Sequence, residues 1–466
     1  MKDHPSSSAT ALLLPVLVAV LPACKTQETA LDVYVQKEDP TYSWKLLWSH
    51  VGAGFTTHLI DLTSQTWRQP DEVDRTVWQH WLTVVEPDEV KHDTALLFIG
   101  GGSNGREPPD EADSKLARIA VGTGTVVAEL RMIPNQPLTF IGDDNRPRKE
   151  DDLIAHTWNK FMDTGDPTWL ARFPMVKSAV RAMDTIQALP GQTDSKPRVE
   201  KFVVAGGSKR GWTTWLTAAV DSRVTAIVPI VIDVLNVKIS MEHHLAAYGF
   251  WAPAVGDYER NGIMERRTDP QYVELLRLVD PYAYRDRFTM PKLMINSTGD
   301  QFFLPDSSQF YFDDLPGEKH LRYVPNTDHG LGDSDAAETL HAFYLAVLTG
   351  KPRPEFSWSL EANGAIRVTT QTPPKEVKLW QASNPSERDF RLRTIGRAWK
   401  SSPLSSTEEG VYVASVPEPP SGWIAFFVEL TFDGDPLPIK LTTEVRVVPD
   451  TLPFVEKLKS TSLAGN

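Results

Sequence analysis

The sequence predicts an α/β fold in which a mostly parallel sheet is covered by helices on both faces and is followed by a β-sandwich. Short continuous apolar runs such as "TALLFI" are typical of strands that are buried on both faces of a sheet. These runs alternate with segments of helical periodicity, which is the pattern of α/β domains. Beyond residue 356 the helical period ends, and short strands with Asn-Gly and Asp-Gly turns follow.

The first 24 residues have the order of an export signal. The apolar run at 9–21 is too short to span a bilayer as a mature helix, and "LPAC" follows it directly. This order resembles a bacterial lipoprotein signal, in which Cys24 becomes the acylated N-terminus and associates with the membrane. The alternative is an ordinary secretory signal with an incidental cysteine. We therefore expect an exported protein, located in the periplasm or at the outer membrane as a lipoprotein, or outside the cell.

The α/β domain is expected to occupy residues 31–350. We expect antiparallel strands within 44–67 and at 77–87, buried strands at 94–102, 124–132, 199–207, 224–233 and 291–300, and helices at 111–121, 175–189, 212–220 and 337–350. The segments near 134–172 and 234–288 are longer than ordinary connections and rich in aromatic residues. They predict a lid over a site at the strand ends, the alternatives being surface padding or a subunit contact.

The C-terminal part is predicted to be a second domain. The proline-containing segment "GKPRPEF" reads as a stiff linker. Six or seven short runs follow, among them "FRLRTIG" and "GWIAFFVELTF", and they predict an Ig-like β-sandwich at 356–450.

Composition narrows the range of partners. The formal net charge is −13 and no cluster of Lys and Arg is visible, which argues against a nucleic-acid partner. Cys24 is the single cysteine, so no intramolecular disulfide is possible. The segment "MEHHLAAYG" lacks the H-E-x-x-H spacing, and no phosphate-binding G-x-x-x-x-G-K-[ST] loop occurs. We expect neither a metal nor a cofactor.

Ser208, in "VVAGGSKRGW", is the candidate nucleophile. It lies between a predicted strand and a predicted helix, where a tight turn exposes a hydroxyl and glycines keep the strained backbone clear of its neighbours. Gly211 comes one residue later than in the usual G-x-S-x-G elbow, and Arg210 stands where a small residue normally allows close packing. An anion-binding loop is the alternative reading of this motif taken alone.

The order of polar residues at the strand ends favours catalysis. Ser208 follows an inner predicted strand, Asp300 the penultimate one and His329 a further short strand, which is the Ser, Asp, His order of α/β-hydrolases. In such a triad His329 takes the proton from Ser208 and Asp300 orients the imidazole. Asp233, at the end of another strand, is the alternative acid.

The residues that would stabilise an oxyanion can also be named. A backbone N–H in the glycine run at Gly101 and Gly102 would lie beside that of Lys209, and together they would hold the oxyanion. The side chains of Lys209 and Arg210 are either solvated charges, or groups that attract an acidic substrate or steady the oxyanion.

Long motifs carry a family resemblance. "AGGSKRGWTTWLTAAVDSRVTAIVPIVIDVLN", together with "STGDQFFLPDSSQFYFDDLPGEKHLRYVPNTDHGL" and "YSWKLLWSH", resembles the PhoPQ-activated pathogenicity-related protein family. The resemblance implies an exported protein with an α/β-hydrolase-like fold, a Ser208, Asp300 and His329 centre, and a link to virulence. The serine motif is also similar to that of glucuronoyl esterases, and the domain layout to that of prolyl-oligopeptidase-type peptidases.

The sequence thus predicts an exported serine hydrolase that cleaves an ester or amide through an acyl-enzyme. A small molecule, a glycan ester or a peptide would be the substrate. The alternative is a non-catalytic binding, signalling or virulence-associated protein on a hydrolase scaffold.

Overall fold

The computed structural model describes residue 1 and residues 28–189, 197–434 and 436–458. The predicted export signal, with Cys24, lies outside the described residues. Among the helices that the structure describes, none has the length and apolar character needed to cross a membrane.

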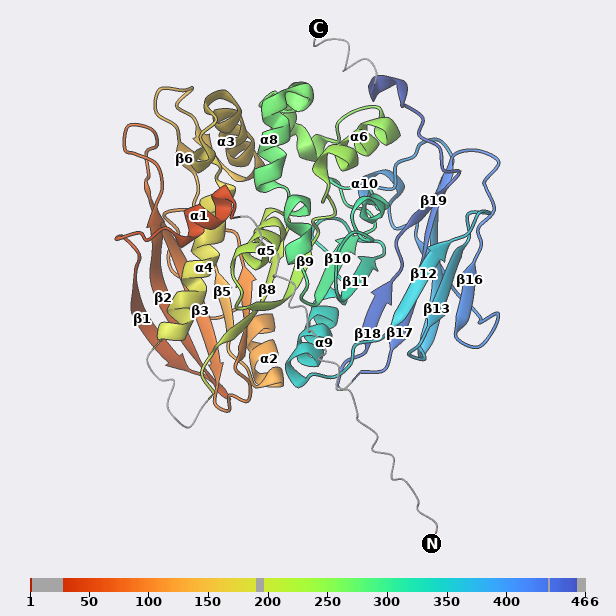
Figure 1. Cartoon of the computed structure of the whole chain (residues 1–466), viewed down its shortest axis with the longest axis horizontal. Coiled ribbons are helices and arrows are strands. Elements are labelled where there is room, and N and C mark those ends of the chain that lie inside the picture. The colour runs from red at the N-terminus through yellow and green to blue at the C-terminus, as the bar shows by residue number, and fades with distance from the viewer. Residues whose placement is uncertain (2–27, 190–196, 435, 459–466) are drawn as a thin grey trace.

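A long mixed sheet runs through the molecule (Figure 1). Its strand order is β1-β2-β3-β5-β4-β8-β9-β10-β11-β18-β17-β14-β15, and β19 pairs with β17. The six strands from β5 to β11 are parallel, whereas β1, β2 and β3 form an antiparallel edge, as predicted. The bounds are β1 Ser43–Val51, β2 Phe55–Thr66, β3 Val77–Pro87, β4 Thr94–Ile99, β5 Val127–Leu130, β8 Lys201–Gly207, β9 Val224–Ile230, β10 Lys292–Ser297, β11 Lys319–Val324, β14 Glu376–Asn384, β15 Lys400–Pro403, β17 Trp423–Phe432, β18 Ile439–Thr442 and β19 Arg446–Val448.

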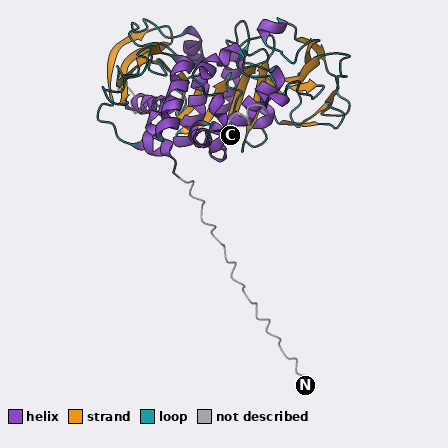
Figure 2. Cartoon of the chain, turned by 90° about the horizontal axis from the view of Figure 1, so that it is seen from above, coloured by secondary structure: helices purple, strands orange, loops and turns teal. Residues whose placement is uncertain are grey.

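Helices cover both faces of the parallel strands, which confirms the predicted α/β class. Successive side chains of a strand point to opposite faces, so Leu97 and Val204 join one hydrophobic core and Leu96 and Val203 join the other. The first core includes residues of α1, α4 and α5, and the second includes residues of α2 and α9. These helices are α1 Ala30–Gln36, α2 Ser114–Thr123, α4 Arg172–Ala188, α5 Lys209–Val220 and α9 Ala336–Thr349. Figure 2 shows helices in the middle of the molecule and strands at both sides.

The two insertions form mostly helical structure above the carboxyl ends of the parallel strands (Figure 1). The first contains β6 Leu138–Thr139, β7 Pro147–Arg148, α3 Glu150–Thr164 and the 3-10 helix η1 Pro167–Trp169. The second contains α6 Val237–Tyr248, η2 Pro253–Val255, α7 Gly256–Arg260, η3 Glu265–Thr268, α8 Pro270–Val279 and η4 Pro281–Arg287. A further 3-10 helix, η5 Ser307–Phe310, follows β10.

The C-terminal strands fall into two sheets. Strand β18 extends the central sheet by pairing antiparallel with β11, with Thr442 opposite Leu321. A second sheet has the order β12-β13-β16, with bounds β12 Phe356–Leu360, β13 Ile366–Thr370 and β16 Val411–Ala414. Val368 of β13 and Val428 of β17 belong to the same hydrophobic core as Leu293 of β10. The core of the α/β region therefore continues into the C-terminal strands.

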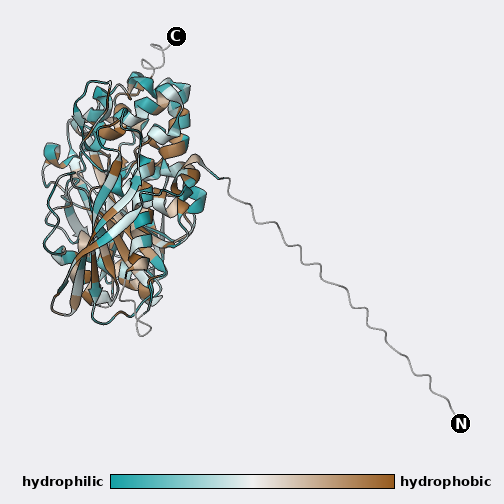
Figure 3. Cartoon of the chain, turned by 90° about the vertical axis from the view of Figure 1, so that its left-hand side faces the viewer, coloured by the Kyte–Doolittle hydropathy of each residue, from teal (hydrophilic) through white to brown (hydrophobic). Residues whose placement is uncertain are grey.

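One predicted strand is wrong. The segment "FRLRTIG" forms a turn and the short helix α10, Leu392–Ile395. The Asp389 carboxylate accepts hydrogen bonds from the backbone N–H of Arg391 and the hydroxyl of Thr394, and these bonds bend the chain. Figure 3 shows hydrophobic stretches of the strands in the interior and hydrophilic stretches on the outer helices and loops.

Candidate active site

Ser208 occupies a strained turn between β8 and α5. Its backbone has φ 56° and ψ −126°, and residues other than glycine rarely adopt a positive φ. Such a conformation costs about 1–3 kcal/mol and persists only where the surrounding structure imposes it. Here the Ser208 N–H donates to the carbonyl oxygen of Ile230 at 2.8 Å, and the Ser208 carbonyl accepts from Trp212 N–H at 2.9 Å. The turn is therefore held on both sides with the serine at its apex.

Two glycines make this turn sterically possible. A Cβ on Gly206 would lie 2.8 Å from the carbonyl oxygen of Arg210, and a Cβ on Gly211 would lie 2.8 Å from the carbonyl oxygen of Gly206. Gly211 therefore provides the close approach of helix to strand, one residue later than in the usual elbow. Arg210 fits in the position of a small residue because Gly206 has no side chain to meet it.

Asp300 and His329 lie in the loops that follow β10 and β11. The Nδ1 atom of His329 is 2.8 Å from Oδ2 of Asp300, whose other oxygen accepts from the Phe302 N–H at 2.7 Å. Asp300 is 4% exposed. A buried carboxylate on Nδ1 fixes the imidazole orientation and leaves Nε2 as the atom available for proton transfer.

Phe302 connects this pair to the serine. Its ring lies 4.5 Å from the His329 ring, centroid to centroid, and its side chain lines the same cavity as Ser208. Among the described residues, none forms a hydrogen bond with the Ser208 hydroxyl. Catalytic hydrogen bonds are often long before substrate binds, so this geometry is compatible with a serine and a base that meet in the substrate complex.

Asp233, the alternative acid, has other partners. Its carboxylate accepts hydrogen bonds from the hydroxyls of Tyr311 and Tyr323, each at 2.6 Å. Burial raises the pKa of Asp233 to about 7, although both tyrosine hydrogen bonds oppose this rise. No hydrogen bond joins it to a histidine within the described part of the chain. The geometry thus favours Asp300 as the partner of His329.

The backbone donors named for the oxyanion lie beside the serine turn. Lys209 is the first residue of α5, where N–H groups have no helical partner. A Cβ on Gly101 would lie 2.9 Å from a terminal nitrogen of Arg210, so the glycine loop packs against the residue two positions after the serine. Within the described ranges, the N–H groups of Lys209, Gly101 and Gly102 have no hydrogen-bond partner. They are free to donate to a substrate oxygen.

The side chains of Lys209 and Arg210 are engaged in ion pairs. Lys209 Nζ lies 2.8 Å from Glu150 and 3.2 Å from Asp151, and Arg210 lies 2.7 Å from the other oxygen of Glu150. Burial would raise the pKa of Glu150, but the hydrogen bond and charge of Arg210 and the charge of Lys209 lower it to about 2. The two cations therefore attach the first insertion to the nucleophile turn.

Glu150 and Asp151 are functional residues that sequence reasoning missed. They begin α3 in the run "KEDD". The helix dipole is sufficient to explain acidic residues in the first turn of a helix, so such a run needs no other partner. A local signal therefore existed, but it gave no indication that this run pairs with the cations after Ser208.

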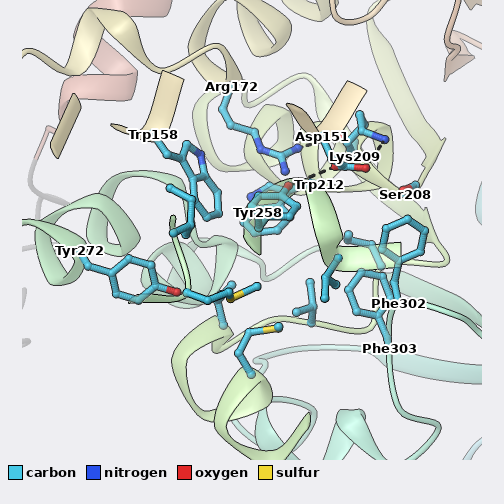
Figure 4. Close-up of a pocket in the computed structure, with 17 residues that line it drawn as sticks. Asp151, Trp158, Arg172, Ser208, Lys209, Trp212, Tyr258, Tyr272, Phe302 and Phe303 are labelled. Carbon is cyan, nitrogen blue, oxygen red and sulfur yellow. Dashed lines mark hydrogen bonds and ion pairs between the residues drawn. The ribbon is translucent and has the colours of Figure 1, made fainter. Parts of the chain in front are cut away.

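A largely apolar cavity opens beside Ser208 (Figure 4). Both insertions contribute to its walls, as do α4, α5 and the loop after Asp300. The lining residues are Asp151, Trp158, Arg172, Ser208, Lys209, Trp212, Ile232, Val234, Val237, Met241, Val255, Tyr258, Ile263, Met264, Tyr272, Phe302 and Phe303. Within the described chain, no group of three or more His, Cys, Asp or Glu side chains is arranged to hold a metal ion.

Two comparisons with known proteins match most of the chain. The family described as PhoPQ-activated pathogenicity-related protein matches residues 31–391. Autocrine proliferation repressor protein A of Dictyostelium discoideum is 41% identical over 456 residues, which cover 91% of this chain and 92% of that protein.

Two solved esterases are among the similar structures. Acetyl xylan esterase 1 from Thermoanaerobacterium sp. JW/SL YS485 matches with a TM-score of 0.48 and 17% identity, over 68% of this chain and 93% of that chain. The acetyl xylan esterase from Paenibacillus sp. R4 matches with a TM-score of 0.48 and 18% identity, over 69% of this chain and 96% of that chain.

Proposed function

The chain belongs to the PhoPQ-activated pathogenicity-related protein family, and from this premise we propose that it is an exported serine hydrolase that cleaves an ester or amide. The observation that carries the proposal is the Asp300–His329 pair, which Phe302 links to the cavity of the strained Ser208 turn. A strained serine on a strand-to-helix turn, with a carboxylate-oriented imidazole nearby, is the arrangement that nucleophilic catalysis by serine requires.

The proposed reaction proceeds through an acyl-enzyme. The Ser208 oxygen attacks the substrate carbonyl carbon while His329 Nε2 accepts the hydroxyl proton. The negative charge on the carbonyl oxygen is stabilised by the N–H of Lys209 and an N–H of the Gly101–Gly102 loop. His329 then gives its proton to the leaving group, and the C–O or C–N bond breaks. Water, deprotonated by His329, attacks the acyl-enzyme and releases the acid and the free serine.

A fluorophosphonate probe tests this proposal, because such a probe forms a covalent bond with an activated serine. We expect the native mature protein to be labelled at Ser208 and the Ser208→Ala variant to remain unlabelled. A His329→Ala variant should be labelled far more slowly, since its serine has lost the base. Absence of labelling in the native protein, or equal labelling of Ser208→Ala, would contradict catalysis by this residue.

A second candidate is a signalling protein that does not use the serine. The name of the Dictyostelium discoideum relative describes a repressor of proliferation, which favours this alternative. The two candidates differ in their dependence on Ser208. If the purified protein slows cell proliferation and Ser208→Ala does so equally well, the biological effect does not require hydrolysis.

Two further parts of the sequence prediction belong to the proposal. The first is export through residues 1–24, with acylation of Cys24 as the anchoring step. Metabolic labelling with radioactive palmitate, compared between the native protein and Cys24→Ser, tests this acylation. The second is an Ig-like sandwich at 356–450, in which the β12-β13-β16 sheet packs against the strands around β17.

A further inference from the structure

The cavity beside Ser208 has walls that are mainly aromatic and aliphatic. Figure 4 shows Ser208, Phe302 and Phe303 at one end and Trp158 and Tyr272 at the opposite end, so the space leads away from the serine. The aliphatic lining residues are Ile232, Val234, Val237, Met241, Val255, Ile263 and Met264. A group that extends from the serine into this cavity therefore meets apolar surface over most of its length.

Lys209 and Asp151, which line the cavity, are paired with each other, and Arg172 is buried against the protein. Lys209 is bound to Glu150 and Asp151, and Asp151 also accepts a hydrogen bond from the Tyr258 hydroxyl at 3.1 Å. Arg172 is 1% exposed, donates to the Lys209 carbonyl oxygen at 3.0 Å and lies over the Trp212 ring at 4.1 Å. A substrate carboxylate in this cavity would lose its hydration, and the Lys209 ammonium group that it would meet is already paired with two carboxylates.

The size of the cavity also limits which substrate group can enter it. Its volume is about 60 Å³, so the free space is narrow. A narrow space admits an alkyl chain or a flat ring more easily than a hydrated sugar. Met241 and Met264 line it, and flexible methionine side chains adapt to the shape of an apolar ligand.

We infer that this cavity is an acyl-binding pocket that takes an uncharged apolar acyl group of an ester substrate. The inference rests on the proposed hydrolase function and specifies its substrate class. It also assigns a role to the side chains of Lys209 and Arg210. They pair with Glu150 and Asp151 of the first insertion and do not attract an acidic substrate.

Hydrolysis of p-nitrophenyl esters with acyl chains of increasing length and a constant leaving group tests the inference. We expect kcat/KM to rise about threefold per methylene until the chain fills the cavity and then to fall. Tyr272→Ala should shift the optimum to longer chains, because Tyr272 closes the end far from Ser208. Tyr282→Ala is the matched control, since the Tyr282 hydroxyl bonds Asp314 and its side chain is not among those that line the cavity.

A second series compares kcat/KM for the hexanoyl ester with kcat/KM for its analogue that carries a terminal carboxylate on the acyl chain. A third series uses acetate esters and varies the length of the alkyl alcohol. We expect the carboxylate to lower kcat/KM at least about tenfold, because it loses its hydration in a largely apolar space. Preference for the carboxylated ester would overturn the inference. So would a flat acyl series combined with a strong dependence on the length of the alcohol.

Failure of the inference can be distinguished from failure of the proposed function. If the fluorophosphonate labels Ser208 but the acyl series is flat, the hydrolase proposal stands and the acyl pocket is wrong. If neither labelling nor hydrolysis occurs, titration calorimetry of Ser208→Ala with octanamide measures whether the cavity binds an apolar ligand independently of catalysis. Saturable binding that Tyr272→Ala alters and Tyr282→Ala does not would support an apolar ligand site, and absence of binding would overturn it.

Discussion

His329 Nδ1 donates a hydrogen bond to Asp300 Oδ2 at 2.8 Å, although the two residues follow different strands of the parallel sheet. Strands β10 and β11 are neighbours, with Ser297 opposite Val324 at their carboxyl ends, so the loops after them emerge side by side. The sheet itself therefore brings the acid to the base, and the pairing does not depend on either insertion.

Replacing this acid should remove most of the activity. In Asp300→Asn the side-chain oxygen can still accept from Phe302 N–H, but its amide would face His329 Nδ1 and impose the wrong tautomer. We expect kcat to fall about 10³- to 10⁴-fold with little loss of folded protein. Asp233→Asn is the control and should leave kcat essentially unchanged. The reverse result, measured with the best ester substrate, would make Asp233 the acid.

Glu150 should hold the nucleophile turn against the first insertion. Glu150→Gln leaves Lys209 and Arg210 without their shared carboxylate, and we expect a loss of about 1–2 kcal/mol because a side chain that is 39% exposed is partly screened. Glu242→Gln, which breaks an exposed pair with Lys238, is the control and should cost less. Urea unfolding at neutral pH measures both free energies. Equal losses would contradict the role of Glu150.

The same carboxylate predicts a pH dependence. The pKa of Glu150 is lowered to about 2 in the folded protein, so its stabilisation is complete above its ordinary pKa and is lost as the pH falls toward 2. The stability difference between native protein and Glu150→Gln should therefore shrink in acid.

Asp233 should act in the opposite direction. Burial raises its pKa to about 7, so between its ordinary pKa of 3.8 and about 7 the folded protein keeps a proton that the unfolded chain loses. Stability should fall as the pH rises through this window, by a few kcal/mol at most. Asp233→Asn should flatten this slope. Urea unfolding of both proteins at pH 5 and pH 8 checks the sign, and a slope that survives in Asp233→Asn would assign it to other groups.

Gly211 and Gly207 form a matched pair of sites for an added methyl group. In Gly211→Ala the new carbon would lie 2.8 Å from the Gly206 carbonyl oxygen and 3.0 Å from Ile232 Cγ2, so the helix must move away from the strand. We expect a loss of about 1–3 kcal/mol and a large fall in kcat, because the serine moves with the helix. In Gly207→Ala the nearest atom would be Val231 Cγ2 at 4.0 Å, and thermal unfolding should change little. Similar melting temperatures for the two variants would contradict this account.

Arg388 should stabilise the loop that carries Asp300. It lies 2.6 Å from Asp306, which is also 3.1 Å from His243, and both members of the Arg388–Asp306 pair are almost fully buried. Arg388→Met would leave the Asp306 carboxylate without its main counter-charge, and we expect a loss of about 3–5 kcal/mol. Adding Asp306→Asn should recover much of this loss. If the double variant is no more stable than Arg388→Met, the buried charge is not the cause.

The sequence predicted the parallel sheet because a strand buried on both faces must be apolar at every position, as in "TALLFI". The same reasoning failed for "FRLRTIG", whose alternation of polar and apolar residues also fits a turn. Its conformation is set by hydrogen bonds to Asp389 that alternation does not reveal. The pairing of β18 with β11 was also missed, because pairing between strands separated by a linker has no local sequence signal.

In the site, chain order placed Ser208, Asp300 and His329 at strand ends, since the topology of the sheet determines those positions. The partners of Lys209 and Arg210 could not be predicted in the same way. Glu150 meets them only because the first insertion folds back over the serine turn, and this depends on the packing of α3 as a whole.

Residues 388–392 contact the loop that carries Asp300, and this contact can form only late in translation. Arg388 binds Asp306, and the Leu392 N–H donates to the carbonyl oxygen of Gly299, directly before Asp300. During translation the nucleophile turn emerges long before these residues, so a nascent chain that already contains Ser208, Asp300 and His329 still lacks the anchors of the acid loop. The loop that carries Asp300 therefore gains these two contacts only after residues 388–392 have left the ribosome.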